Sequence, residues 1–368
     1  MLISFDAVVV GAGIAGASVL LALPVSHGLK VAVIAPPQIP GFRIGESLPP
    51  AAREELKRLD IYDEFVAEVP TLEANRKFSA WGSPVLREQG NNPPFATSGL
   101  SIDREFFQQW IWQHAKRKVH FTSFAHTVAS VSKQKHGWSV KLTDGSTLNT
   151  TFLLDASGRK AVVARDALQR QKLDKLVCVY SEVSPLETNI ERTPGPMVEA
   201  QPAGWFYSAL LPNQKLVLAF FTDADLLRDG VHRDAEAFYK RVRESVFNEK
   251  RRETGGYDRP RWIKVVDAAT SICKCLHSEG LLAVGDAAFS VDPLSSHGIT
   301  TALWSGRKVG AILPQVAAGD TASTESYVGA FEKGIQKILQ EHQLIHQLEQ
   351  RWPQEPFWAR RHRSDRES

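Results

Sequence analysis

The sequence "AVVVGAGIAG", residues 7–16, leads an apolar run into the pattern Gly-x-Gly-x-x-Gly. An Ala- and Leu-rich stretch to residue 23 predicts a helix, and residues 31–34 predict a second strand. A glycine pattern between a strand and a helix is typical of the phosphate-binding turn of a dinucleotide site. The sequence therefore predicts an α/β fold that begins with a Rossmann-like domain.

The residues of this turn have separate physical roles. Gly11 permits the tight turn, Gly13 lets a pyrophosphate approach the backbone, and Gly16 lets the helix and strand pack closely. The helix N-terminus presents N–H groups and a partial positive charge, at Ile14 and Ala15, to the phosphates. We expect all five residues to bind the cofactor.

One part of the usual fingerprint is missing. The second strand should end at a carboxylate that holds the ribose hydroxyls, and Ala35 stands at that place. Two interpretations stay open: a nearby side chain or water replaces the carboxylate, or the cofactor is held less tightly than usual.

Length and composition exclude several classes of protein. At roughly 100 to 200 residues per domain, a chain of 368 residues has room for two joined domains, and its net charge of +3 is too small to favour nucleic acid. No apolar run approaches the roughly 20 residues of a membrane span, and no secretory signal precedes the first strand, so we expect a cytoplasmic protein. Cys178, Cys273 and Cys275 are an odd number without a second Cys or His cluster, so we expect neither a disulfide framework nor a metal site.

A second ligand loop is indicated by "GLLAVGDAAFSVDPLSSHGI", residues 280–299. A buried strand at 281–284 ends beside Asp286, where a carboxylate can bind a ligand hydroxyl at the crevice of the sheet. Gly298 then begins a helix, predicted over 299–311, that is aimed at the same place.

This stretch resembles the flavoprotein monooxygenase and flavin-dependent halogenase superfamily, which has the p-hydroxybenzoate hydroxylase type of fold. The resemblance implies that Asp286 binds the ribitol of FAD and that Pro293, Gly298 and Ile299 face the isoalloxazine ring. It also implies an FAD-binding domain of residues 1–75, 100–166 and 270–320, an inserted β-sheet substrate domain of residues 76–99 and 167–269, and a C-terminal helical segment of residues 321–368.

Three further stretches agree with the same superfamily. "FRIGESLPP", from residue 42, implies that Arg43 contacts phosphate and that Glu46 and Ser47 lie near the flavin. "LSIDREFFQQ", from residue 100, implies that Arg104 reaches the FAD. Residues 126–159 alternate like a β-meander with a turn at 144–145, in which Val128 would touch the adenine.

The elements outside the nucleotide site have simpler expectations. "GWFYSALLPNQKLVLAFF", from residue 204, predicts two strands, with Trp205 and Tyr207 on one face. Residues 234–250 predict one amphipathic helix, and residues 327–351 predict a C-terminal helix that packs on the FAD domain.

The choice of chemistry depends on a few side chains. Reduced flavin with O₂ can pass an oxygen atom to an electron-rich ring or oxidise halide, while the protein positions, desolvates and protonates. Tyr207 replaces the second Trp of the tryptophan halogenases beside Trp205, and Ser295 replaces their glutamate, which favours oxygen transfer. Lys77 stands near the position of the lysine that the tryptophan halogenases use in catalysis. A lysine on the solvent-exposed face of a strand would account for this residue equally well.

The remaining candidates each have two interpretations. Trp205 and Tyr207 either line a pocket for an aromatic ring or belong to the core. His297 either donates a proton or orients the substrate, since its ordinary pKa lies near working pH, or it is a helix-start residue packed at the surface.

The length, "GESLPP", "GWFYSALLP" and the tail "RWPQEPFWARR" resemble one subgroup, the LodB and GoxB type of flavoproteins needed for cysteine tryptophylquinone biogenesis. That resemblance implies hydroxylation of a Trp side chain in a quinoprotein oxidase precursor. A small-molecule aromatic hydroxylase, a halogenase, and a maturation partner with little turnover stay open. Electrons would come from NAD(P)H directly or from reduced flavin supplied by a flavin reductase.

Overall fold

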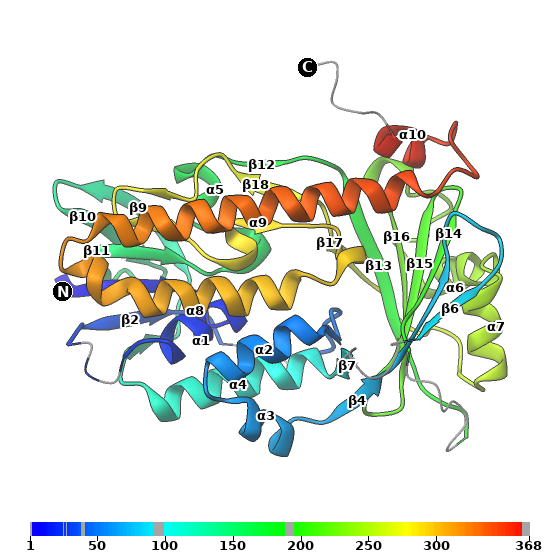
Figure 1. Ribbon diagram of the computed structural model, residues 1–368, viewed down its shortest axis with the longest axis horizontal. Helices are drawn as coiled ribbons and strands as arrows, with labels where there is room; N and C mark the ends of the chain where they lie inside the picture. Colours follow the sequence, from blue (N-terminus) through cyan, green and yellow to red (C-terminus); the bar gives the residue numbers. More distant parts are fainter. Residues whose placement is uncertain are drawn as a thin grey trace.

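The computed structural model describes residues 2–24, 26, 28–37, 41–90, 99–187 and 195–362 (Figure 1). Its first sheet is built on β1 (Leu2–Val10), which pairs in parallel with β2 (Val31–Ile34) and β11 (Thr147–Asp155). The other strands of this sheet are β8 (Thr122–Phe124), β9 (Val128–Gln134), β10 (Gly137–Leu142), β19 (His277–Ser278) and β20 (Leu281–Ala283). The strand order β19-β20-β11-β1-β2-β8 brings the ends of β1, β11 and β20 to one edge.

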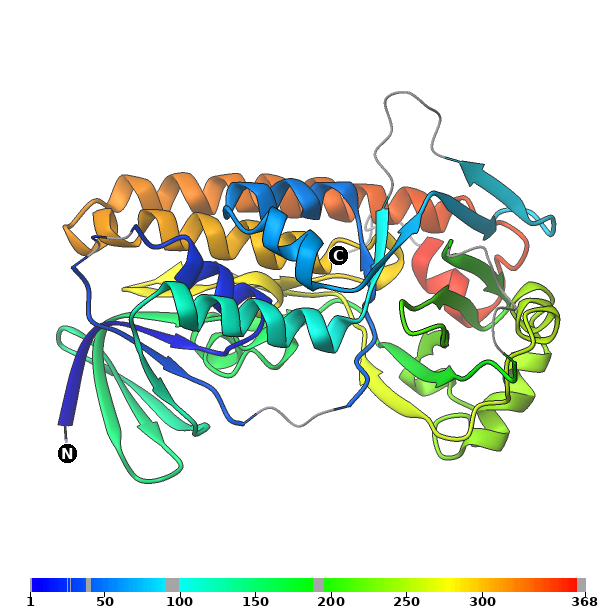
Figure 2. The same ribbon diagram turned by 90° about the horizontal axis from the view of Figure 1, so that it is seen from below.

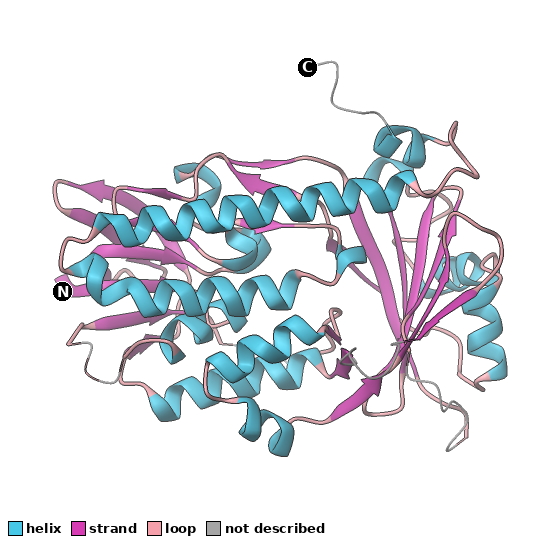
Figure 3. Ribbon diagram, in the orientation of Figure 1, coloured by secondary structure: helices cyan, strands magenta, loops and turns pink. Residues whose placement is uncertain are grey.

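Helices cover this sheet because their apolar faces need burial. Helix α1 (Ile14–Leu21) packs against α4 (Arg104–Lys118) and α8 (Gly298–Ala317), and α2 (Pro50–Arg58) packs on α8. The close approach of α1 and α8 depends on Gly310, where a Cβ atom would lie 2.1 Å from the carbonyl oxygen of Val19. Figure 3 shows these helices gathered around the first sheet.

A second sheet lies beside the first, at the right in Figure 1. Its order is β17-β13-β16-β15-β14-β5-β6, with bounds β17 (Lys264–Asp267), β13 (Leu176–Val183), β16 (Leu216–Asp223), β15 (Gly204–Leu210), β14 (Met197–Gln201), β5 (Arg76–Ala80) and β6 (Arg87–Gly90). Two apolar clusters form on its faces, one containing Phe206 and the other containing Trp205 with Tyr207. The predicted strand pair and the shared face of Trp205 and Tyr207 are confirmed.

The remaining elements connect or cover the two sheets. Short sheets are formed by β3 (Ser47–Leu48), β4 (Thr71–Ala74) and β7 (Gly99–Ile102), and by β12 (Arg170–Lys172), β18 (Ser271–Cys273) and β21 (Phe289–Ser290). The other helices are α3 (Tyr62–Glu68), α5 (Ala164–Ala167), α6 (Ala235–Arg243), α7 (Phe247–Thr254), α9 (Thr321–Gln347) and α10 (Pro356–His362).

Helix α9 runs along α8 and reaches the second sheet, where α10 follows it (Figures 1 and 2). It begins six residues before the predicted start, because the Asp320 side chain accepts hydrogen bonds from Ala322 N and Ser323 N and caps the helix there. It ends at Gln347, four residues before the predicted end.

The single helix predicted over 234–250 is wrong, because the chain forms α6 and then α7 in that range. The cause is Glu199, a buried carboxylate on β14 that accepts hydrogen bonds from Val246 N, Phe247 N and Asn248 N at 2.7–3.1 Å. These N–H groups belong to the first turn of α7, so Glu199 caps a new helix where the pattern predicted a continuous one. The first helix also ends at Leu21, two residues before the predicted end.

The fold class is the predicted one: α/β, with a Rossmann-like sheet, an inserted second sheet and a C-terminal helical segment. The exact domain boundaries stay a prediction. Across the described ranges, we find no helix with the length and apolar character that a membrane crossing requires.

Candidate functional site

The glycine turn lies where β1 ends. Gly11 has a φ of +114°, and a Cβ there would lie 2.4 Å from the carbonyl oxygen of Ala156. A Cβ on Gly16 would lie 2.0 Å from the carbonyl oxygen of Gly11, whereas a Cβ on Gly13 would meet nothing within 4 Å. The turn is therefore tightly packed at Gly11 and Gly16 and open at Gly13. Ile14 and Ala15 follow directly in the first turn of α1, and both are buried.

A hollow of about 410 Å³ extends from this turn. It is lined by Ala12 of the turn, by Ala35 after β2 and by residues of α4. Three of the α4 residues are polar: Gln109, Gln113 and Lys116. These side chains lie in the same hollow as Ala35, where the usual carboxylate is missing. The sequence interpretation missed them, although their spacing puts them on one side of the helix that Arg104 begins.

Four predicted residues from distant parts of the chain form one polar cluster, which consists of Arg43, Glu46, Arg104 and Asp286. Burial lowers the pKa of Arg104, and the positive charge of the nearby Arg43 lowers it further. The negative charges of Asp286 and Glu46 lie close enough to raise it. The side chain of Glu46 is buried, and its Oε2 accepts a hydrogen bond of 3.0 Å from Gly45 N. Ser47 follows in β3, which pairs with β7. The cluster thus holds two cations and two carboxylates next to the ends of the parallel strands.

Tyr207 connects the second sheet to this cluster. Burial raises the pKa of Tyr207 well above its ordinary value, and the negative charge of the nearby Glu46 adds to the effect. Trp205, two residues earlier, is buried and stacks on Phe221 at a ring distance of 3.8 Å. Among the described residues, the indole Nε1 of Trp205 has no hydrogen-bond partner. Lys77 lies on β5 with its side chain exposed.

Asp286 is positioned by two arginines. Arg170 Nη2 donates a 2.8 Å hydrogen bond to the carbonyl oxygen of Asp286, and Arg159 Nε lies 3.9 Å from its carboxylate. Arg159 also donates to the carbonyl oxygens of Ala269 and Val291, at 2.8 and 2.7 Å. The arginines therefore brace the backbone on both sides of the Asp286 turn.

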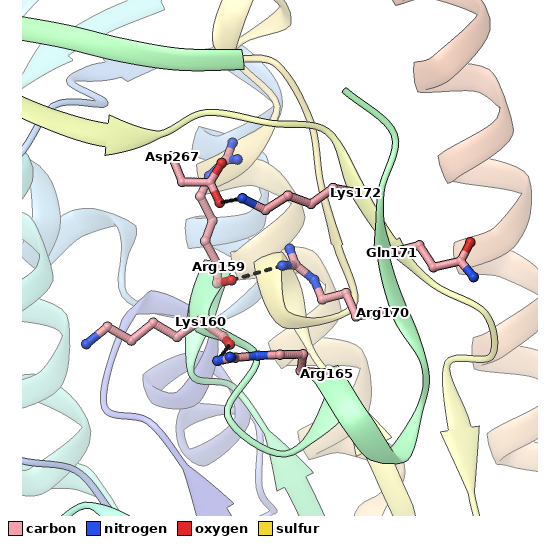
Figure 4. A pocket seen from close by; sticks show the side chains of 7 residues that line it. All are labelled: Arg159, Lys160, Arg165, Arg170, Gln171, Lys172 and Asp267. Carbon is pink, nitrogen blue, oxygen red and sulfur yellow. Dashed lines mark hydrogen bonds and ion pairs between the residues drawn. The ribbon is translucent and has the colours of Figure 1, made fainter. Parts of the chain in front are cut away.

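Both arginines line a cationic hollow of about 380 Å³ (Figure 4). The other residues around it are Lys160, Arg165, Gln171, Lys172 and Asp267. Figure 4 shows most of these side chains in internal contacts: Arg165 bonds the carbonyl oxygen of Lys160, and Lys172 lies 2.7 Å from Asp267. Neither hollow includes Val128, which is half-buried on β9.

The turn after Asp286 leads into α8. Pro293 is exposed, Gly298 begins the helix in open space, where a Cβ would meet nothing within 4 Å, and Ile299 is buried behind it. The side chain of Ser295 lies outside the described part of the structure. His297 is half-buried, and its Nε2 lies 3.6 Å from Glu341 on α9. Burial lowers the pKa of His297 despite that carboxylate, so its imidazole is neutral at pH 7.

Comparison with known proteins agrees with this geometry. The sequence matches the tryptophan halogenase family over residues 6–139 and 97–367. LodB of Marinomonas mediterranea, provisionally named an FAD-dependent oxidoreductase, is 28% identical over 98% of this chain and 97% of its own.

Solved structures share the fold. The myxobacterial chondrochloren halogenase CndH is similar with a TM-score of 0.85 and 20% identity, over 99% of this chain and 87% of its own. QhpG, a peptidyl tryptophan dihydroxylase essential for tryptophylquinone cofactor biogenesis, is similar with a TM-score of 0.75 and 20% identity, over 97% of this chain and 78% of its own.

These relatives confirm the predicted resemblance to flavin-dependent oxygenases and halogenases and the prediction of an FAD-dependent oxidoreductase. Because the two matched ranges together span nearly the whole sequence, the chain belongs to the tryptophan halogenase family.

Proposed function

We propose that this chain is an FAD-dependent monooxygenase that hydroxylates the indole ring of a Trp side chain in a partner protein. The partner is the precursor of a quinoprotein oxidase, and the modified Trp becomes part of cysteine tryptophylquinone. The full-length similarity to LodB and the tryptophan dihydroxylase activity of QhpG support this assignment.

The site fits an extended FAD molecule. The open space at Gly13 and the N-terminus of α1 suit the pyrophosphate, together with Arg43. The hollow beside Ala35 suits the adenosine, with Gln109, Gln113 and Lys116 in reach of its hydroxyls. At the other end, Arg104 and Asp286 would hold the ribitol, and Pro293, Gly298 and Ile299 would lie beside the ring.

The bound FAD supplies the redox chemistry: with O₂ and two electrons it delivers one oxygen atom. In the net reaction, one oxygen atom of O₂ would replace a ring hydrogen of the indole as a hydroxyl group, and the other would leave as water with two electrons and two protons. The electrons come from NAD(P)H or from reduced flavin made by a reductase. This chain's own residues bind both molecules, exclude water and hold the substrate in place.

The observation that carries the proposal is the position of Tyr207, which the second sheet places near the buried carboxylate of Glu46 in the polar cluster. Tyr207 replaces the second Trp of the halogenases, so a phenol stands where the substrate sheet meets this cluster. Trp205, only 1% exposed, stacks on Phe221 in the core of the second sheet and belongs to the core interpretation of this residue, where it fixes the strand that carries Tyr207. A precisely placed polar group on a rigid strand is suited to orient an aromatic substrate.

The test is mass spectrometry of the precursor coexpressed with this chain. The proposal expects a precursor Trp peptide heavier by one or two oxygen atoms, with the increase lost at FAD concentrations too low to load Asp286→Ala, which binds FAD more weakly. A precursor of unchanged mass, in cells where the flavoprotein is folded and loaded with FAD, would refute it.

Halogenation is the second candidate, because CndH shares the fold over 99% of this chain. The same experiment with added chloride or bromide distinguishes the two reactions, since the mass increase then corresponds to a halogen. Lys77→Met should abolish halogenation and leave hydroxylation unchanged.

A further inference from the structure

We propose that Asp292, His342 and His346 bind one divalent first-row transition-metal ion. Asp292 stands directly before the turn that begins at Pro293, and the two histidines lie four residues apart near the end of α9. A spacing of four puts both imidazoles on one face of a helix, one turn apart. The proposal does not depend on the reaction that the enzyme catalyses.

The ligand atoms have the spacing of a metal site. His342 Nε2 lies 3.1 Å and His346 Nε2 lies 3.5 Å from the same carboxylate oxygen, Asp292 Oδ2. One ligand atom from each residue lies within 4.8 Å of the other two. Tetrahedral ligands that sit about 2.0–2.1 Å from a zinc ion are about 3.3 Å from one another. The two measured distances bracket that value.

The tautomer of His346 leaves a lone pair directed at the carboxylate. Its Nδ1 lies 3.0 Å from the carbonyl oxygen of His342, which can only accept, so Nδ1 carries the proton. In a neutral imidazole that donates from Nδ1, Nε2 carries the lone pair. A lone pair facing a carboxylate oxygen is repulsive unless a cation lies between them. Metal-bound histidines commonly donate their other N–H to a backbone carbonyl in this way.

The Nε2 atoms of both histidines lack a hydrogen bond of good geometry among the described residues. The side chain of His346 is only 2% exposed, so water from bulk solvent does not readily satisfy its Nε2. Buried polar atoms without partners are costly, and a bound cation would satisfy both imidazoles at once.

The surroundings are apolar, with one cation nearby. The rings of Trp81 and Trp358 lie 5.8 and 6.1 Å from that of His346. Arg361 is close enough to disfavour positive charge at His346, but its Nη2 is paired with Asp223 at 2.8 Å. The positive charge of Arg361, which would repel a metal ion, is therefore largely neutralised by Asp223.

Two imidazole nitrogens and one carboxylate favour zinc, iron, cobalt or nickel over magnesium and calcium, which prefer oxygen ligands. A bound ion would tie α9 to the turn of residues 292–298. It would thereby fix the C-terminal segment against both sheets. The cysteines alone suggested no metal site, and the signal that was missed is the His-x-x-x-His spacing on an amphipathic helix.

The experiment measures binding of Zn²⁺ to the full-length, untagged protein after treatment with a chelator. Competition with a chromogenic chelator gives the affinity, and elemental analysis gives the stoichiometry. We expect one Zn²⁺ per chain and a higher melting temperature with the metal. His346→Gln and His342→Gln should each weaken binding at least tenfold, whereas His136→Ala, which removes an exposed histidine, should have no effect.

Substitution of a buried residue can disturb folding, so Co²⁺ provides a second measurement on the wild-type protein. Strong visible d–d bands, displaced by one equivalent of Zn²⁺, are expected of a site with nitrogen ligands and low coordination number. The proposal is overturned if the wild type binds no Zn²⁺ at micromolar concentration, or if folded histidine variants bind it as tightly as the wild type. A magnesium-selective site would also overturn it.

Discussion

The glycine turn of residues 11–16 and the junction at which the second sheet and α9 meet the segments of residues 43–47 and 292–297 are built in different ways. In the first, residues 11–16 of one continuous turn supply the glycines and the N–H groups. In the second, single side chains from distant segments meet: Tyr207 with Glu46, and Asp292 with His342. A local turn is encoded by a short motif, whereas the junction exists only when the whole chain is folded. The two regions should therefore respond differently to substitution.

The largest effect is expected at Gly16. Gly16→Ala puts a Cβ 2.0 Å from the carbonyl oxygen of Gly11, which should cost about 1–3 kcal/mol of stability and also open the FAD turn. Gly310→Ala makes an equally close contact with Val19 but lies on the α1–α8 interface. Chemical denaturation measures the stability of both variants, and titration with FAD measures their affinity. We expect only Gly16→Ala to bind FAD more weakly. Equal FAD affinities would contradict the claim that FAD binding depends on the local geometry of this turn.

The next effect is expected at Asp286. Asp286→Ala removes a charged hydrogen-bond acceptor worth about 1.5–3 kcal/mol, so FAD affinity should fall about 10- to 100-fold. Asp267→Ala is the matched control, because this carboxylate of the same region pairs with Lys172 at 2.7 Å and accepts a hydrogen bond from Ala269 N but lies outside the polar cluster. Fluorescence titration with FAD measures both. Equal losses in the two variants would mean that Asp286 does not contact the cofactor.

A smaller effect on stability, about 0.5–1.5 kcal/mol, is expected for Tyr207→Phe, because the buried carboxylate of Glu46 then loses a polar neighbour. Tyr180→Phe is the control, since that hydroxyl makes only a 3.5 Å contact to the carbonyl oxygen of Phe42. We expect FAD affinity to stay near wild type in both, and the rate of precursor modification to fall only in Tyr207→Phe. A rate unchanged in that variant would remove Tyr207 from the active site.

The smallest effect is expected at His297. Burial lowers the pKa of His297, so the ring is neutral at pH 7, and it faces Glu341 on α9. A general acid usually contributes about 100-fold or more to a rate. We expect His297→Asn to change the rate of modification less than tenfold and to leave its pH profile unchanged between pH 5 and 8. A 100-fold loss would contradict this and show that His297 takes part in the reaction, and a changed pH profile would identify it as the proton donor.

The sequence predicted the local parts of the molecule well. The strand-helix-strand unit, the meander and the pair β15–β16 all follow from short patterns of apolar residues and glycines. The break between α6 and α7 could not be predicted, because its cause is Glu199, nearly fifty residues away in the chain. The polar residues of α4 that lie where the carboxylate is missing were also overlooked, since only the folded helix brings them beside Ala35.

The central claim is that the FAD site acts on a Trp side chain of a partner protein. The most direct measurement is the mass of the precursor's Trp peptides after reaction with purified, FAD-loaded enzyme, an electron donor and ¹⁸O₂. We predict a Trp peptide that carries ¹⁸O from the gas. A precursor that stays unmodified while the same enzyme hydroxylates free indoles, or a peptide that gains halogen and no oxygen, would contradict the account.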